Sequence, residues 1–229
     1  MTICLAVDIG GTKIAAALIE MYSAAKSNIV ARHLIETRSS GDPLLLTAAL
    51  AELLGPLAAS ADYVAVASTG IIDNGVLTAL NPQNLGGLDH FPLHNVIAQI
   101  TDLPVYLIND AQAAAWAEYL AYRQEFADLA FITVSTGVGA GLILNHKLIT
   151  GSRGLLAMLV ICWWILKAHN VVVVVVVALK LLPPVVRLRL PDKPYSVVHV
   201  VVCRYISFIY KVMHEHRLLF GVLLTQSLS

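Results

Sequence analysis

The chain has 229 residues, 58% of them hydrophobic, and its 15 basic and 15 acidic residues cancel. That length allows one large domain or two small ones, and the apolar fraction is ample for a core. The three cysteines (Cys4, Cys162 and Cys203) have no metal-binding spacing, and their odd number argues against a disulfide framework. We therefore expect a protein of the reducing cytoplasm. The start of the chain shows no secretory signal pattern.

The neutral total conceals two unlike parts, which meet near Gly154. Residues 1–154 contain 13 of the 14 glycines, with 7 basic against 13 acidic residues, a net charge of −6. Residues 155–229 contain one glycine, 17 valines, and 8 basic against 2 acidic residues, a net charge of +6. The first part is typical of a compact enzyme lobe, whereas the second part has almost no glycine for turns.

Apolar runs between turn residues predict a series of strands in the first part. In chain order they are Ile3–Val7, Ile14–Ile19, Ile29–Ile35, Tyr63–Ala67, Val105–Ile108, Leu129–Val134 and a further strand before a turn at Asn145-His146. Helical spacing predicts helices over Pro43–Leu54, ended by Gly55-Pro56, and over Ala111–Arg123. A strand meander followed by alternating strands and helices indicates an α/β lobe with a mixed sheet.

The segment Asp8–Lys13 (DIGGTK) is predicted to turn between two strands, so it is neither a P-loop nor a dinucleotide-binding fingerprint. Adjacent glycines let backbone amides approach an anion, Thr12 can add a hydroxyl donor, and Asp8 could hold a magnesium-bound water. The alternative is an ordinary glycine hairpin turn. A second small-residue turn, Ser135–Gly141, follows another apolar strand and could bind a further phosphate.

Two polar segments lie between these turns. Asn109-Asp110 follows a buried strand and opens a helix, so Asp110 is either a helix N-cap or a general base, with Asn109 holding a sugar. The segment Leu80–Gly87 offers Asn81 and Asn84 for sugar hydroxyls, or for an Asx-type turn. His90, His94 and His146 are predicted to lie at the surface, and Trp116 in the core.

Together these segments resemble a known family. DIGGTK, ASTGI, NPQNLGG, INDAQAAAWAEY and FITVSTGVGAG, in this order and spacing, are similar to the ROK family of sugar kinases. The resemblance runs from about Ile3 to Gly154. It implies an actin-like, ribonuclease-H-like ATPase fold, of which this chain has the N-terminal lobe and the start of the second lobe. The chain shows no helix-turn-helix segment of the family's repressor branch.

Two stretches, LNPQNLGGLDHFPL and INDAQAAAWAEY, resemble the branch that phosphorylates N-acetylmannosamine at its 6-hydroxyl in sialic acid catabolism. The resemblance implies ATP and Mg²⁺ as cofactors and Asp110 as the catalytic base. Implied sugar-binding residues are Ser68, Thr69, Gly70, Asn81, Asn84 and Asn109. Implied nucleotide-binding residues are Leu5, Ala6, Val7, Asp8, Ile9, Gly10, Gly11, Thr12, Ile132, Thr133, Val134, Ser135, Thr136, Gly137, Val138 and Gly139. The family implies a homodimer, and we expect neither nucleic acid nor membrane as a partner.

After Gly154 the chain departs from the family. The family continues with a histidine-containing helix start, a CGCGxxGC zinc cluster and EAIASGR, and none of these is present. We interpret residues 155–229 as an out-of-frame tail with no native domain. If one base is lost near the codon for Leu156, each later residue is read from the second base of an original codon. Valine codons begin with GT, so each valine of Val171–Val177 requires an original codon that ends in GT. Such codons encode Cys, Gly, Arg or Ser. Ala178–Val186 is likewise compatible with CVEAIASGR, and the unpatterned valines suit no helix or strand period.

This interpretation predicts a product of kinase ancestry that is inactive or nearly so, without the family zinc site and with an aggregation-prone valine run. A lineage-specific apolar segment is the alternative. Three other functions remain open: a ROK kinase for another hexose or N-acetylhexosamine, a nonenzymatic sugar-binding or nucleotide-binding lobe, and a membrane-attached protein that uses Leu155–Leu179. The apolar run Leu155–Leu166 has only 12 residues, too few to span a bilayer.

Overall fold

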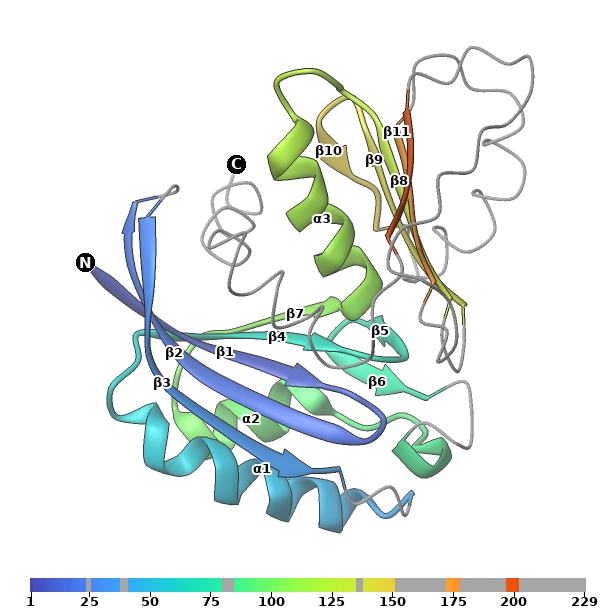
Figure 1. Ribbon diagram of the computed structural model, residues 1–229. Helices are drawn as coiled ribbons and strands as arrows, with labels where there is room; N and C mark the ends of the chain where they lie inside the picture. Colours follow the sequence, from blue (N-terminus) through green and yellow to red (C-terminus); the bar gives the residue numbers. More distant parts are fainter. Residues whose placement is uncertain are drawn as a thin grey trace. The chain divides into compact units, whose positions relative to one another are not determined.

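The computed structural model describes residues 1–23, 26–37, 41–79, 85–134, 138–150, 172–177 and 197–201 (Figure 1). The described residues divide into two compact units. The first comprises Met1–Asp110, and the second begins at Ala111.

A five-stranded mixed sheet forms the centre of the first unit. Its strands are β1 (Thr2–Ile9), β2 (Lys13–Ser23), β3 (Lys26–Glu36), β4 (Tyr63–Ser68) and β7 (Val105–Asn109), in the order β3-β2-β1-β4-β7. The first three strands form an antiparallel meander, and β4 and β7 then continue parallel to β1. Each predicted strand of this unit is therefore confirmed, although all five are longer than their apolar runs.

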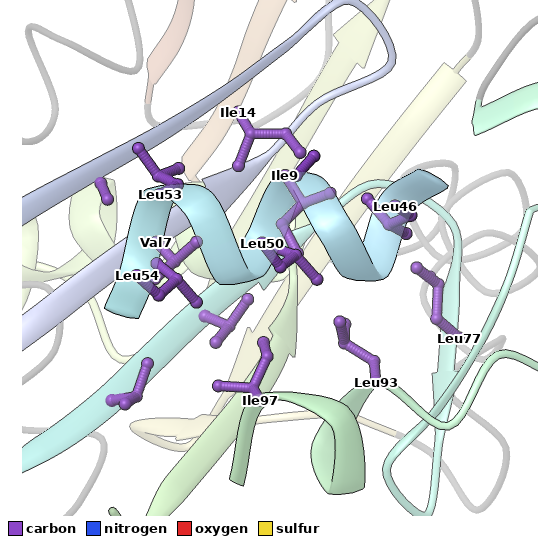
Figure 2. Packing of buried hydrophobic residues seen from close by; sticks show 14 of the residues in the cluster. Val7, Ile9, Ile14, Leu46, Leu50, Leu53, Leu54, Leu77, Leu93 and Ile97 are labelled. Carbon is purple, nitrogen blue, oxygen red and sulfur yellow. The ribbon is translucent and has the colours of Figure 1, made fainter. Parts of the chain in front are cut away.

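Two helices cover one face of this sheet, α1 (Pro43–Ala58) and α2 (Leu93–Thr101) (Figure 1). Alternate β1 residues point toward them: Figure 2 shows Val7 and Ile9 facing Leu50 and Leu54 of α1 and Ile97 of α2. All five side chains are fully buried. Burial of one such side chain contributes about 1.5–3 kcal/mol, so this face carries much of the stability of the unit.

Helix α1 begins as expected but ends later. Asp42 caps it by accepting a 2.8 Å hydrogen bond from the Leu44 amide, and Pro43 occupies the first turn. The predicted stop at Gly55-Pro56 is wrong, since the helix continues to Ala58 with Pro56 inside it. Proline cannot donate to the carbonyl four residues earlier. The extra turn nevertheless buries Leu57 in the core, which offsets the lost bond.

Four short elements between β4 and β7 were not predicted. They are β5 (Ile71–Asp73), β6 (Val76–Thr78), the 3₁₀ turn η1 (Leu85–Gly87) and α2. β5 and β6 form a hairpin around Asn74-Gly75, both with positive φ angles, which is the residue pair that a tight hairpin turn favours. That signal was present in the sequence. Helix α2 ends at Asp102 in the left-handed conformation, a position at which glycine is more usual.

The second unit contains helix α3 (Asp110–Tyr122), whose first residue is the last of the first unit, and a second five-stranded sheet. The strands are β8 (Leu129–Val134), β9 (Val138–Leu144), β10 (Lys147–Leu148), β11 (Val172–Val177) and β12 (Val197–Val201), in the order β10-β9-β8-β11-β12. A Cβ added at Gly141 of β9 would overlap the Ala115 side chain and lie 2.8 Å from the Ala111 carbonyl oxygen. Glycine on β9 therefore lets α3 lie directly against this strand.

Within residues 155–229 the structure describes β11 and β12. The expectation that the valine run suits no strand is wrong for Val172–Val177, which pairs in parallel with β8 on one side and β12 on the other. A strand paired on both sides tolerates a continuous apolar run, because parallel strands are commonly covered on both faces. The out-of-frame origin of this part stays a prediction. The stretch Leu155–Leu166 lies outside the described residues. Among the residues that the structure describes, no helix is long and apolar enough to cross a membrane.

Candidate active site

The strand register of the first unit brings polar residues from three strands to one edge of the sheet. Asp8 of β1 pairs with Ala67 of β4, and Ser68 at the end of β4 pairs with Asn109 at the end of β7. Asp110 follows Asn109 directly. In parallel α/β sheets the carboxyl ends of the strands are where ligands bind. The edge therefore gathers Asp8, Asn109 and Asp110, as the sequence predicted.

Two carboxyl groups interact at this edge. Asp8 is half-buried. Burial, and secondarily the negative charge of Asp110, raises the pKa of Asp8 from 3.8 to about 7. Two interacting carboxylates make a site that a divalent cation would stabilise, and carboxylate oxygens are the ligands that Mg²⁺ prefers. The predicted Mg²⁺ therefore fits the donor groups present here.

Helix α3 places Asp110 in its first turn. The partial positive charge of a helix N-terminus stabilises a carboxylate there. Asp110 is the first residue of the helix. The alternative role of helix N-cap belongs to the residue before the helix. Asn109 stands in that preceding position, as the last residue of β7.

Asn109 is oriented by the segment that follows β4. Its Nδ2 donates a 2.8 Å hydrogen bond to the Gly70 carbonyl oxygen. Gly70 has a φ of 92°, and a Cβ added there would lie 2.7 Å from the Thr78 carbonyl oxygen at the end of β6. The predicted sugar-binding residue Gly70 therefore touches both the β5–β6 hairpin and Asn109. Ser68 is fully buried and donates to the Thr69 carbonyl oxygen at 3.0 Å, so it supports this edge from inside.

The turn between β1 and β2 has the predicted hairpin form. The Gly10 amide donates to the Lys13 carbonyl oxygen at 3.0 Å, and Thr12 lies exposed at the tip. The side chains of Leu5, Val7 and Ile9 belong to the α1 core, so any part that these three residues play in nucleotide binding would be through the main chain. Ala6 is fully buried as well.

Thr37, directly after β3, is a residue of this turn that sequence reasoning missed. Its amide donates to the Thr12 carbonyl oxygen at 2.9 Å and its hydroxyl donates to the Gly10 carbonyl oxygen at 2.8 Å. A lone threonine after a strand carries no motif that would single it out. Only the antiparallel register of β2 and β3, which pairs Lys13 with Glu36, brings it to the turn.

The second predicted phosphate segment lies in the second unit. Ile132, Thr133 and Val134 end β8, and Val138 and Gly139 begin β9 opposite Val134 and Thr133. A Cβ added at Gly139 would lie 2.9 Å from the Thr133 methyl carbon and 3.0 Å from the Ala111 Cβ. Ser135, Thr136 and Gly137 at the tip lie outside the described residues, as do Asn81 and Asn84, so their predicted roles stay predictions.

The remaining side chains mostly lie where the sequence placed them. His90 and His94 are exposed and Trp116 is buried in the core. His146 is also exposed, and its Nδ1 is hydrogen-bonded to the Tyr119 hydroxyl. No cluster of three or more histidine, cysteine, aspartate or glutamate side chains suited to a metal occurs in the described part of the chain.

Comparison with known proteins identifies the family of this part of the chain. The model of the ROK family matches residues 4–159, which is more than half of the chain. The chain belongs to the ROK family. This part of the chain accordingly has the actin-like ATPase fold of ROK sugar kinases, and the predicted fold class is confirmed for it.

The chain is 56% identical over 151 residues to the N-acetylmannosamine kinase of Escherichia fergusonii, a match that covers 66% of this chain and 50% of that protein. It is also 56% identical over 155 residues to the N-acetylmannosamine kinase of Shigella flexneri, covering 68% and 52%. The chain thus spans about half the length of the curated relatives it matches.

Solved structures show the same fold. A ROK family glucokinase from Streptomyces griseus, in complex with glucose and AMPPNP, is 31% identical with a TM-score of 0.56, covering 68% of this chain and 48% of that one. The inorganic polyphosphate/ATP-glucomannokinase of Arthrobacter sp. strain KM is 20% identical with a TM-score of 0.62, covering 95% and 99%. The latter likeness shows the fold alone.

Proposed function

We propose that residues 1–154 are the base-carrying and sugar-binding part of an ATP-dependent kinase that phosphorylates N-acetylmannosamine at its 6-hydroxyl. The observation that carries this proposal is the placement of Asp110 at the carboxyl edge of the sheet, beside Asp8 and directly after Asn109. The 56% identity to N-acetylmannosamine kinases over the same residues supports the substrate. The Streptomyces glucokinase, which is 31% identical and holds AMPPNP, supports ATP as the phosphate donor.

In this proposal Asp110 is the general base. A carboxylate accepts the proton of the sugar hydroxyl as the oxygen attacks the γ-phosphorus in line, and the bond to the leaving ADP oxygen breaks. A base positioned in this way contributes a factor of about 10²–10⁴ to the rate. The N-terminal turn of α3 favours the ionised form of Asp110 that this role requires.

The other residues of the edge position and neutralise charge. Asp8 is the residue placed to hold Mg²⁺, which when bound supplies positive charge against the polyphosphate. Asn109 points its amide at the Gly70 carbonyl oxygen, and this bond sets the orientation in which it meets a sugar hydroxyl. The glycine turn after β1 presents backbone amides for phosphate oxygens.

We further propose that the chain as it stands turns over little or no sugar. The family match ends near residue 159, close to the point where glycines disappear and valines accumulate. An ATPase fold of this kind needs its second lobe to close around the nucleotide. Residues 155–229 would not supply that lobe if they are read out of frame.

The test compares two proteins. One is the chain as given, and the other is the protein made after one base is restored near the codon for Leu156. N-acetylmannosamine-dependent release of ADP is measured for both. We expect turnover only from the restored protein, and expect Asp110→Asn in that protein to lower kcat by about 10²–10⁴-fold. Comparable turnover by the chain as given would refute the out-of-frame proposal, whereas no turnover by either would refute the kinase proposal.

A second candidate substrate is glucose, because the Streptomyces neighbour that is 31% identical binds it. The same assay distinguishes the two sugars through their kcat/KM values. A value for glucose above that for N-acetylmannosamine would move the assignment to a hexokinase activity. Cytoplasmic location and homodimer formation stay predictions.

A further inference from the structure

The turn after β1 is made of flexible glycines, yet binding a phosphate requires backbone amides in fixed directions, so another part of the chain must restrain the turn. Gly10 and Gly11 are adjacent backbone units that rotate freely, since neither has a Cβ. A site for phosphate needs the opposite property, because its amide hydrogens must already point at the anion. If a peptide unit flips, a carbonyl oxygen replaces the amide hydrogen and repels the phosphate.

Two carbonyl oxygens of this turn are held by one residue. The Thr37 hydroxyl donates to the Gly10 carbonyl oxygen at 2.8 Å, and the Thr37 amide donates to the Thr12 carbonyl oxygen at 2.9 Å. The turn is also closed internally by the bond from the Gly10 amide to the Lys13 carbonyl oxygen at 3.0 Å. Three hydrogen bonds therefore hold Gly10, Thr12 and Lys13 of this turn.

Because a peptide unit is planar and trans, a held carbonyl also determines where the next amide points. The bond to the Gly10 oxygen sets the plane of the Gly10–Gly11 peptide, and the bond to the Thr12 oxygen sets the plane of the Thr12–Lys13 peptide. In both units the amide hydrogen points away from Thr37. The hydroxyl of Thr37 acts on the Gly10–Gly11 peptide, whose flip would otherwise cost least.

We propose that Thr37 is a positioning residue for a polyphosphate-binding turn: its hydroxyl locks the Gly10–Gly11 peptide so that the backbone amides of the turn face the phosphates of the nucleotide. This inference rests on the proposed kinase function and adds a residue outside the glycine motif to it. Thr37 reaches the turn from β3, and it acts through the backbone of the turn rather than by touching the nucleotide.

Each variant that tests this proposal changes one small group of a threonine side chain. Thr37→Val keeps the shape of the side chain and removes the hydroxyl, whereas Thr37→Ser keeps the hydroxyl and serves as the rescue. Thr47→Val is the matched control, since the Thr47 hydroxyl donates to the Pro43 carbonyl oxygen at the same 2.8 Å, on helix α1. All three variants are made in the frame-restored protein, because the proposed function requires a second lobe to close around the nucleotide.

The first measurement needs no ligand. Hydrogen exchange of the Gly10 and Thr37 amides reports directly on two of the three bonds that hold the turn. We expect exchange about tenfold faster in Thr37→Val, close to wild type in Thr37→Ser, and unchanged in Thr47→Val. Unchanged exchange in Thr37→Val would overturn the claim that the hydroxyl locks the turn.

The second measurement is the Kd for ATP with Mg²⁺, determined by calorimetry for the same proteins. We expect Thr37→Val to raise it about tenfold, Thr37→Ser to stay within about threefold, and Thr47→Val to match wild type. The Kd for N-acetylmannosamine should not change in any of them. Wild-type nucleotide affinity in Thr37→Val, or an equal loss in Thr47→Val, would overturn the role of Thr37. A frame-restored protein with Thr37 in place that does not bind Mg·ATP would instead overturn the nucleotide role of the turn itself.

Discussion

The two parts of the chain on either side of Gly154 both contain long apolar strands, but glycine is frequent in the first part and nearly absent from the second. Strand β4 is buried along its whole length and then stops at Thr69-Gly70, which places Ser68 and Asn109 side by side at the sheet edge. Strand β11 lies within seven consecutive valines, in a part that has one glycine among 75 residues.

This contrast separates two contributions to a functional fold. Apolar side chains supply burial, and a valine run can pair as a strand as readily as Tyr63–Ser68 does. The position of a site depends on where strands stop, because polar residues and glycines at those points bring carboxylates and amides together. Composition alone would not distinguish the two strands, whereas the residues that follow them do.

The largest expected effect tests whether the first part carries the chemistry. In the frame-restored protein, Asp110→Asn should lower kcat by about 10²–10⁴-fold, because the amide cannot accept the hydroxyl proton. The KM for the sugar should change much less. Glu125→Gln, an acid-to-amide change after the end of α3, is the control and should keep kcat within about twofold. An active Asp110→Asn protein would mean that another residue is the base.

A leucine-to-alanine change in each part of the chain tests which part contributes a core to the free energy of unfolding. Leu50→Ala should lower the free energy of unfolding by about 2–5 kcal/mol, since Leu50 is fully buried between α1 and the sheet. The same change at Leu182, in the part proposed to be out of frame, should stay within about 0.5 kcal/mol. Urea unfolding measures both. A large loss from Leu182→Ala would show that residues 155–229 have a native core and would break the comparison.

The pH dependence of Asp8 is a further prediction. Its pKa is about 7 in the folded chain against 3.8 as its ordinary value, so the folded state binds this proton more tightly. For this group stability is fully present below about pH 4, falls as pH rises from 4 to 7, and is constant above. Asp8→Asn should therefore stabilise the unliganded chain at pH 7.5 by up to about 4 kcal/mol, and little at pH 4.

Thermal melting at several pH values measures this difference. Asp62→Asn is the control, because Asp62 lies at the exposed amino end of β4 and accepts a hydrogen bond from the Ile3 amide. It should not stabilise the chain at high pH. Equal melting temperatures for Asp8→Asn and wild type at pH 7.5 would show that the ionised Asp8 carboxylate does not destabilise the fold in the absence of a cation.

The smallest effect concerns the glycine that contacts Asn109. Gly70→Ala should destabilise the chain by about 1–3 kcal/mol, since φ is 92° and the new Cβ would lie 2.7 Å from a backbone oxygen. Gly55→Ala, in helix α1 with nothing within 4 Å of the new Cβ, should be neutral or stabilise by up to about 1 kcal/mol. Denaturation curves that rank the two variants in the reverse order would contradict the described backbone at Gly70.

The sequence alone predicted which residues lie at the sheet edge, because they lie in short segments with a chemical reason of their own. Asp8, Asn109 and Asp110 each follow an apolar run, and parallel strands bring such positions to one edge. It did not predict the continuation of α1 through Pro56, since a core contact of Leu57 outweighs a local stop signal. The hairpin at Asn74-Gly75 was readable but was missed.

What the sequence by itself determined is the order of the five strands of the first sheet, the composition break at Gly154 and the residue types at the strand ends, because these depend on neighbours along the chain. What only the tertiary structure decided is which distant residues meet. Thr37 is 27 residues from Gly10, and the β2–β3 register brings its hydroxyl to the turn. Gly70 and Asn109 are 39 residues apart, and the β4–β7 pairing joins them. Such contacts arise from strand pairing and burial across the sheet, which no local pattern of residues specifies.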